Sequence, residues 1–421
     1  IKPLDERVLS GSIQRVIDKH KNSPTSEEVV SLVRTDLITN KSFSPSINKM
    51  LVSLRPGKYN DIFGCGLDLS KMKNESFMIS IGNKMVNGVS SPICVKSSSM
   101  KAKTLLLDNL KRLNMIDCNN IIAPLQKLSN CWFNTMFMSL FVSDKGRKFF
   151  KYFRQLMIEG KQANGSIIKS TLLKNGFFLF NACIEATLNI SHDMHTKNVA
   201  LAMDTNGVID ALYNAIQTKQ KNYKWIKESD EAGNPLYYYT DVLNYLGNNS
   251  LNIINIQDRT LIKDYLFTNS NSIYINNIPT SLVNNKLNFR LNAMGGIEKS
   301  PDIFVVSLYD NETQYESGAS NKNKPLVISF TSDQNGQKIS YALDSAIIRD
   351  TSKSHFVSVL MCNSVEKTFD GASISRLSDF KWKSMLNIDN DWTYRYNKPG
   401  YSDMRWNFCK CYQMLFYYRI N

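Results

Sequence analysis

The chain has 421 residues and a formal net charge of +14, with 43% hydrophobic and 21% charged residues. This composition is that of an ordinary globular protein, which excludes overall disorder, and the length suits two domains. Apolar runs such as Phe177 to Phe180 are far shorter than the ~20 residues that a membrane-spanning helix needs, so we expect no membrane span.

Residues 1–115 are predicted to form a smaller, basic N-terminal domain. They hold 18 Lys and Arg against 10 Asp and Glu, so +8 of the net charge lies there and +6 in the rest of the chain. Apolar residues at helical spacing predict helices within 10–40, and the Ser-rich basic stretch at about 90–103 predicts a linker. The charge suits an acidic or nucleic-acid partner, although a solvated basic face is the simpler interpretation.

Residues 116–421 are predicted to form an α+β domain with a helical first half and an antiparallel β second half. A helix from 105 leads towards 122, and further helices are expected at 131–142, 148–158 and 166–188. After about 237 the sequence changes to short β-rich runs separated by Asn, Gly and Asp turns. These runs are at 253–256, 273–278, 303–308, 326–330, 339–348 and 355–362.

The eight cysteines indicate neither a zinc site nor a dense disulfide framework. No CxxC pair occurs, and their wide spacing favours a reducing compartment such as the cytoplasm. The first residues have no apolar core, so no signal peptide is expected, and a first residue Ile1 fits a processed N-terminus. His192 and His195 form a His-x-x-His pair without further ligands, which is more typical of a polar loop, so we expect no metal and no cofactor.

Cys131 is the candidate nucleophile. It follows Ser129 and Asn130, which are good N-cap residues, and it begins an apolar helix. A thiol in the first turn faces unpaired N–H groups and the positive end of the helix dipole, which favour the thiolate. Gln126 lies five residues upstream, and its side-chain amide, with the backbone N–H of Cys131, would form an oxyanion hole.

His355 and Asp370 are the candidate partners of this thiol. His355 begins an alternating strand, a turn at 364–367 follows, and Thr368-Phe369-Asp370 ends the next strand. Cross-strand pairing would bring Asp370 beside His355, where a carboxylate orients the imidazole and stabilises its cation. Each residue also has an ordinary structural explanation, because a buried cysteine, a strand histidine and a hairpin aspartate are all common.

The residues around these positions resemble the ubiquitin-specific proteases. Asn130 to Thr135 read Asn-Cys-Trp-Phe-Asn-Thr, where that family has Thr-Cys-Tyr-Met-Asn-Ser. Tyr341 to Ile348 and then Ser354-His355-Phe356 resemble its His box, and Phe369-Asp370 resembles the start of its Phe-Asp-Asp. The chain ends in a strand, 411–419, similar to the closing strand of the family.

The resemblance implies a papain-like cysteine peptidase domain that cleaves peptide or isopeptide bonds after the C-terminal glycine of ubiquitin or a ubiquitin-like protein. Cys131 would be the nucleophile, His355 the general base and acid, and Asp370 the residue that orients His355. Gln126 falls where the family usually has an oxyanion Asn. The sequence departs from the family at Leu128 and Ser354, which replace glycines, and in the missing CxxC pairs of the zinc fingers.

Three other hypotheses stay open from the sequence. The first is a papain-like or calpain-like protease of other substrates, because those enzymes also place Gln before Cys-Trp. The second is a basic scaffold protein with a relic peptidase fold, packaged in the virion of a large DNA virus, since Asn, Lys, Ile and Ser are abundant as in AT-rich genomes. The third is a nucleic-acid-binding module. The lack of a compact basic run and of a recognised binding motif argues against it.

Overall fold

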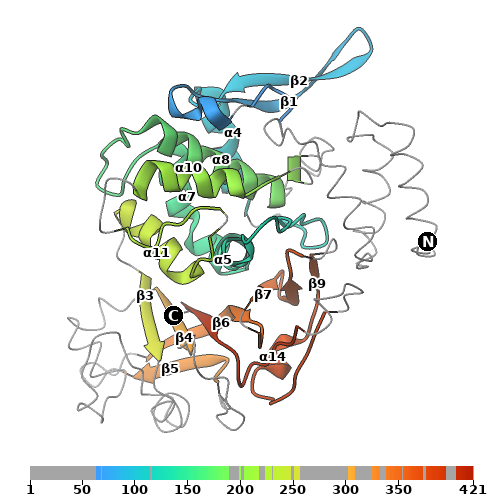
Figure 1. Ribbon diagram of the computed structural model, residues 1–421, viewed down its shortest axis with the longest axis vertical. Coiled ribbons are helices and arrows are strands. Elements are labelled where there is room, and N and C mark those ends of the chain that lie inside the picture. Colours follow the sequence, from blue (N-terminus) through green and yellow to red (C-terminus); the bar gives the residue numbers. More distant parts are fainter. Residues whose placement is uncertain are drawn as a thin grey trace.

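The computed structural model shows a helical layer packed on a mixed β-sheet (Figure 1). The residues that the structure describes are 63–67, 69–113, 116–188, 199–200, 203–217, 223–229, 231–247, 251–256, 302–308, 324–331, 338–352, 354–372, 376–394 and 404–420. The predicted helices at 10–40, the strand at 273–278 and both His192 and His195 lie outside them.

Helices make up most of the described chain before residue 246. They are η1 (Leu69–Lys73), α4 (Met100–Lys111), α5 (Cys131–Phe141), α6 (Gly146–Phe149), α7 (Lys151–Glu159), α8 (Thr171–Leu188), α10 (Asn206–Leu212), the π-helix η3 (Tyr213–Gln217) and α11 (Pro235–Tyr245), with α14 (Trp382–Met385) later in the chain. A two-stranded hairpin, β1 (Met78–Val86) and β2 (Val89–Lys96), projects from this helical layer (Figure 1).

The second half forms an eight-stranded sheet. Its strands are β3 (Leu251–Ile256), β4 (Ile303–Leu308), β5 (Val327–Thr331), β6 (Lys338–Arg349), β7 (Phe356–Cys362), β8 (Val365–Phe369), β9 (Leu377–Asp379) and β10 (Gln413–Arg419). The order is β3-β4-β10-β6-β7-β8-β9, and β5 pairs with the first half of β6. All pairs are antiparallel except β3 with β4, which are parallel.

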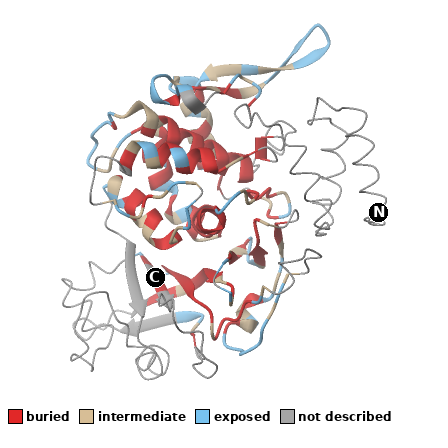
Figure 2. Cartoon of the chain, viewed as in Figure 1, coloured by how far each residue is buried: buried red, intermediate tan, exposed pale blue. Residues whose placement is uncertain are grey.

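Helix α5 lies between the helical layer and the sheet and is buried on all sides. All its residues are buried, and it packs against β7, β6 and α11 (Figure 2). A helix that is apolar around its whole circumference is expected in such a central position. Asp344 of β6 accepts hydrogen bonds from the backbone N–H groups of Lys145 (2.8 Å) and Gly146 (3.4 Å), which holds the segment after α5 to the sheet.

The α+β prediction is confirmed, and several finer predictions are wrong. The helix at 131–142 and the strand at 303–308 lie where they were expected. The prediction of a wholly antiparallel second half is wrong, because β3 and β4 are parallel. The expected linker at 90–103 instead forms β2 and the start of α4, where Ser99 caps the helix by accepting from Ala102 N–H. The helix expected to run from 105 towards 122 ends at Lys111.

Residues 63–113 share a hydrophobic cluster with the following helices. Phe77 stacks edge-on against Phe178 of α8 with ring centroids 6.1 Å apart, and Leu106 and Leu110 of α4 lie in the same buried cluster. The described part of this region is therefore packed on the helical layer. The division of the chain at residue 116 and the role of residues 1–115 stay predictions.

The cysteines form two disulfides among the described residues, which the spacing did not predict. Cys65 pairs with Cys94 within the hairpin region, and Cys118 pairs with Cys362 at the end of β7. Cys131, Cys183, Cys409 and Cys411 are free and buried. The reducing compartment stays a prediction.

The described residues contain neither a membrane-spanning helix nor a metal-holding cluster. No helix there is long and apolar enough to cross a bilayer. Likewise, no cluster of three or more His, Cys, Asp and Glu side chains in the described ranges is arranged to hold a metal ion.

Lys324 is a buried cation just before β5. Its side chain is almost fully buried, and Nζ donates to the backbone oxygen of Phe408 at 2.7 Å. Burial lowers the pKa of Lys324 from 10.5 to about 7, although the nearby Cys409 opposes the shift. Burial has this effect because a charged ammonium loses more hydration than a neutral amine.

We expect Lys324→Met to remove a pH dependence of stability. Between pH 7 and 10.5 the unfolded chain binds a proton at Lys324 that the folded chain does not, so the free energy of unfolding rises with pH in that window. The stability of Lys324→Met relative to the unchanged protein should therefore fall between pH 7 and pH 9 in urea unfolding. The exposed control Lys111→Met should show no such trend, and an equal trend in both variants would contradict the assignment.

Candidate active site

Cys131 is the first residue of α5 and is 7% exposed. The N-cap is Asn130, as expected, but its side chain makes no capping hydrogen bond and Ser129 is exposed. Asn130 occupies the predicted N-cap position, but its carboxamide turns back, and Oδ1 accepts from the N–H of Lys127 at 3.0 Å. The first N–H groups of a helix have no partner within it, so the Cys131 thiol lies at an uncapped, electropositive helix end.

A buried polar network holds the loop before Cys131 against α10. Asn130 Nδ2 donates to Thr205 Oγ1 at 3.0 Å, and Thr205 Oγ1 donates to Asn134 Oδ1 at 2.7 Å. All three side chains are fully buried. Because every member bonds another, this network fixes the position of the loop and therefore of the thiol.

Leu128 explains one departure from the ubiquitin-specific protease pattern. It has a φ of +52° and is 69% exposed. This left-handed conformation costs a residue with a Cβ roughly 1–2 kcal/mol and costs glycine almost nothing. The backbone thus has a glycine-type conformation at the position where that pattern has glycine.

His355 is held at the start of β7 by the Asp350 carboxylate. Asp350 Oδ1 accepts from the N–H of His355 at 2.6 Å and of Ser354 at 2.8 Å, and the N–H of Asp350 donates to the oxygen of His355 at 2.9 Å. The Ser354 hydroxyl also donates to Asp350 at 3.4 Å. Ser354, which stands where the family pattern has glycine, is therefore part of the loop that positions the imidazole.

Asp370 follows β8 and pairs with His355. The two side chains are 0% and 2% exposed, and Nε2 of His355 lies 2.7 Å from Oδ1 of Asp370. The hairpin turns at Asn363 and Ser364, both with positive φ, so the turn is tighter than the expected 364–367. In this register the start of β7 and the end of β8 meet at one end of the hairpin, which brings the two side chains together.

The net charge environment favours the imidazolium form of His355. Burial lowers the pKa of His355, but the Asp370 carboxylate and hydrogen bonds with Asp370 and Cys131 raise it, so that it lies well above its usual range. Because Nε2 faces Asp370, Nδ1 is the ring nitrogen left for the thiol. The imidazole is therefore paired with the carboxylate, and the Cys131 thiol is near enough to affect its pKa.

Aromatic rings enclose the pair on the side of the C-terminal segment. Trp406 meets the His355 ring edge-on, with ring centroids 6.1 Å apart, and Tyr394 meets Trp406 in the same way at 5.2 Å. The Tyr394 hydroxyl bonds Thr368 Oγ1. Burial and then the Asp370 charge raise the pKa of Tyr394 well above its usual range, so this hydroxyl stays protonated.

Gln126 lies beside the His355–Asp370 pair because it bonds Gly371, the residue after Asp370. Its backbone N–H donates to the oxygen of Gly371 at 2.8 Å, and its Nε2 donates to the oxygen of Leu128 at 3.4 Å. A Cβ on Gly371 would come within 3.2 Å of Gln126, so the close approach favours glycine there. A carboxamide NH2 group has two donors, so the contact with Leu128 leaves the second N–H of Gln126 for an oxyanion.

The structure thus brings Cys131, His355 and Asp370 together with Gln126 alongside. Sequence reasoning missed the residues that hold them, which include Thr205, Trp406 and Asp350. Asp350 had a weak signal, because an Asp followed by Ser two residues later is typical of a side-chain-closed turn. Thr205 and Trp406 come from distant segments, and no local pattern marks them.

No known family and no curated protein matches the sequence. Among solved structures, the SAGA Ubp8/Sgf11/Sus1/Sgf73 DUB module bound to ubiquitin aldehyde is similar, with a TM-score of 0.37, 11% identity and 80% of each chain covered. The same module bound to monoubiquitin has a TM-score of 0.37 and 9% identity over 97% of this chain and 98% of that chain. A yeast SAGA DUB module structure has a TM-score of 0.32 and 9% identity over 72% and 69%. Likeness at this level carries no argument about the present chain.

At Leu128 we expect the usual order of alanine and glycine to be reversed. Leu128→Gly should be more stable than Leu128→Ala by about 1 kcal/mol in urea unfolding, because only alanine is strained at this positive φ. Gln155 is an exposed helical position, and there Gln155→Gly should instead be less stable than Gln155→Ala by about 1 kcal/mol. The same order at both positions would contradict the left-handed conformation of Leu128.

Proposed function

We propose that this chain is a cysteine peptidase in which Cys131 is the nucleophile, His355 the general base and acid, and Asp370 the residue that orients His355. The observation that supports this most directly is the buried pair of His355 and Asp370, with the Cys131 thiol near enough to raise the pKa of His355. The carboxylate occupies Nε2, which leaves Nδ1 of the ring for the thiol in the proposed reaction.

The proposed reaction passes through a thioester. His355 takes the proton of Cys131, and the thiolate attacks the carbonyl carbon of the scissile bond. The backbone N–H of Cys131 and the Gln126 amide stabilise the oxyanion, for which one such donor is typically worth about 3–4 kcal/mol. The His355 imidazolium then protonates the leaving amine. A water molecule, deprotonated by His355, hydrolyses the thioester and regenerates the thiol.

The proposed substrate is a conjugate of ubiquitin or a ubiquitin-like protein, cleaved after its C-terminal glycine. This part of the proposal rests on the sequence resemblance around Cys131, His355 and Asp370 to ubiquitin-specific proteases. The positive φ of Leu128 supports it, since the backbone there has the conformation that glycine allows in the family pattern. The geometry alone is equally compatible with a papain-like protease of other substrates.

We expect a ubiquitin with a C-terminal electrophile to label the protein at Cys131. The thiol should form a covalent adduct, detected as a mass increase of one ubiquitin on a gel and mapped by mass spectrometry, and Cys131→Ala should abolish it. Cys183→Ala is the matched control, because burial raises the pKa of this thiol and keeps it protonated within α8. It should be labelled like the unchanged chain.

The same experiment separates the alternatives. Labelling by a general epoxide inhibitor of cysteine peptidases, but by neither ubiquitin nor ubiquitin-like probes, would indicate a papain-like protease of other substrates. Labelling by none of these reagents in a folded protein would contradict the peptidase proposal and leave the scaffold hypothesis.

We expect Asp370→Asn to shift the alkaline limb of the pH–rate profile to lower pH. Asparagine can still accept the His355 hydrogen bond, but it removes the charge that raises the His355 pKa, so the imidazolium is lost at a lower pH. Asp370→Ala loses the bond as well, and its rate should fall by roughly 10²-fold or more. The measurement is the rate of labelling by the ubiquitin electrophile between pH 5 and pH 10.

Asp108→Asn is the control for the loss of one negative charge. Asp108 is a half-exposed residue of α4 that pairs with Lys111, so its variant should keep the original profile. An unchanged alkaline limb in Asp370→Asn would mean that Asp370 does not set the charge state of His355.

A further inference from the structure

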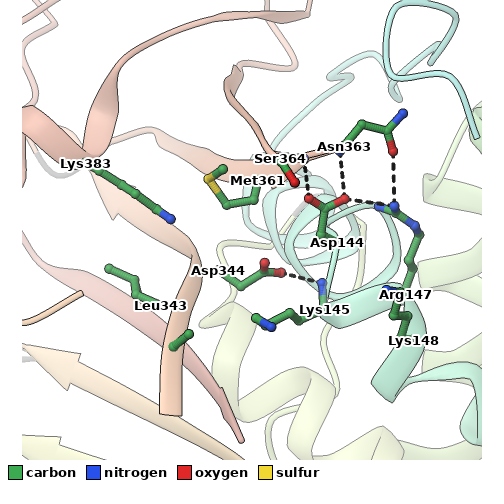
Figure 3. A pocket seen from close by; sticks show the side chains of 11 residues that line it. Asp144, Lys145, Arg147, Lys148, Leu343, Asp344, Met361, Asn363, Ser364 and Lys383 are labelled. Atoms are coloured by element: carbon green, nitrogen blue, oxygen red, sulfur yellow. Dashed lines mark hydrogen bonds and ion pairs between the residues drawn. The ribbon is translucent and has the colours of Figure 1, made fainter. Parts of the chain in front are cut away.

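A cavity lies at the opposite end of α5 and β7 from the candidate active site. Its volume is about 540 Å³ (Figure 3). The lining comes from α6 and the segment before it, from β6, from the β7–β8 turn and from Lys383 of α14. Cys131 is 13 residues before Asp144, and His355 six residues before Met361, so the rise per residue puts the two sites about 20 Å apart.

Both carboxylates that line this cavity accept hydrogen bonds from the protein. Asp144 accepts from the backbone N–H groups of Asn363 and Ser364, each at 2.8 Å, and pairs with Arg147 at 2.8 Å (Figure 3). Asp344 is buried and accepts from the N–H groups of Lys145 and Gly146. Both acids therefore help to hold the fold, and in the described ranges Asp144 pairs with Arg147 and not with a lysine.

Three lysines of the lining have no acidic partner. The ammonium groups of Lys145, Lys148 and Lys383 form no ion pair with another residue in the described ranges. Lys383 and Lys145 extend toward the cavity from opposite walls in Figure 3. Once the Asp144–Arg147 pair is set aside, three positive charges face one buried carboxylate, so the lining carries a net charge of +2.

We propose that this cavity binds a phosphoryl group carried on a small organic ester. Ammonium groups act as compact point charges, which suit a small multiply charged anion such as phosphate. The volume lies within the range of small-molecule sites, roughly 300–1,000 Å³. Leu343 and Met361 add apolar surface to the lining, against which the carbon part of an ester packs.

The test is isothermal titration calorimetry of the full chain with phenyl phosphate and with a short phosphoserine peptide, at 150 mM NaCl. Phenyl phosphate represents a free ester and the peptide a phosphorylated side chain, so the tighter of the two identifies the source. In the double variant Lys145→Gln/Lys383→Gln we expect the affinity for that probe to fall at least about tenfold, since two charge-assisted contacts are lost.

Lys101→Gln/Lys111→Gln is the matched control, since it removes the same charge from two exposed positions of α4. It should bind like the unchanged chain, and thermal unfolding should show that both double variants are folded. Failure of both phosphorylated probes to bind, or equal weakening in the two double variants, would overturn the proposal. Because the readout is binding, the result does not depend on peptidase activity.

Discussion

The packing of α5 against β7 is the contact on which the candidate active site depends. Cys131 begins the helix and His355 immediately precedes the strand, so the packing of these two elements sets the position of the thiol relative to the imidazole. Helix α5 is buried along its whole length, and a close-packed interior resists sliding of one element past another. The β7–β8 ladder then adds Asp370 through local hydrogen bonds, and Thr205 from a distant segment holds the loop before Cys131.

Burial gives the proposed triad its electrostatic character. An imidazolium and a carboxylate are costly to bury apart, and burying them 2.7 Å from each other offsets much of that cost. The surrounding groups complete the arrangement, because Asp370 also accepts from Ala372 N–H at 3.0 Å and Asp350 holds the backbone of His355. Asp350 and Asp370 thus hold the loops that carry the reactive side chains by accepting backbone N–H groups.

The features that sequence reasoning predicted are those with a local cause. The helix that begins at Cys131 follows from an uninterrupted apolar run, and the proximity of His355 and Asp370 follows from hairpin register over 15 residues. The features that it missed depend on tertiary contacts. The Cys118–Cys362 disulfide joins residues 244 apart, and the parallel pairing of β3 and β4 reflects topology that no strand reveals alone. Leu128 is a different case, because leucine gives no local sign of a positive φ.

The same principle of committed carboxylates separates the two ends of α5. At the Cys131 end Asp370 accepts the N–H of Ala372 and also pairs with the buried imidazole of His355. At the other end Asp144 and Asp344 accept backbone N–H groups, so the lysines nearby keep their charge unneutralised. A net charge of +14 by itself says little about function, since charges on a solvated face are screened. The lysines of the cavity are a different case, because the carboxylates beside them, Asp144 and Asp344, already accept hydrogen bonds from the protein.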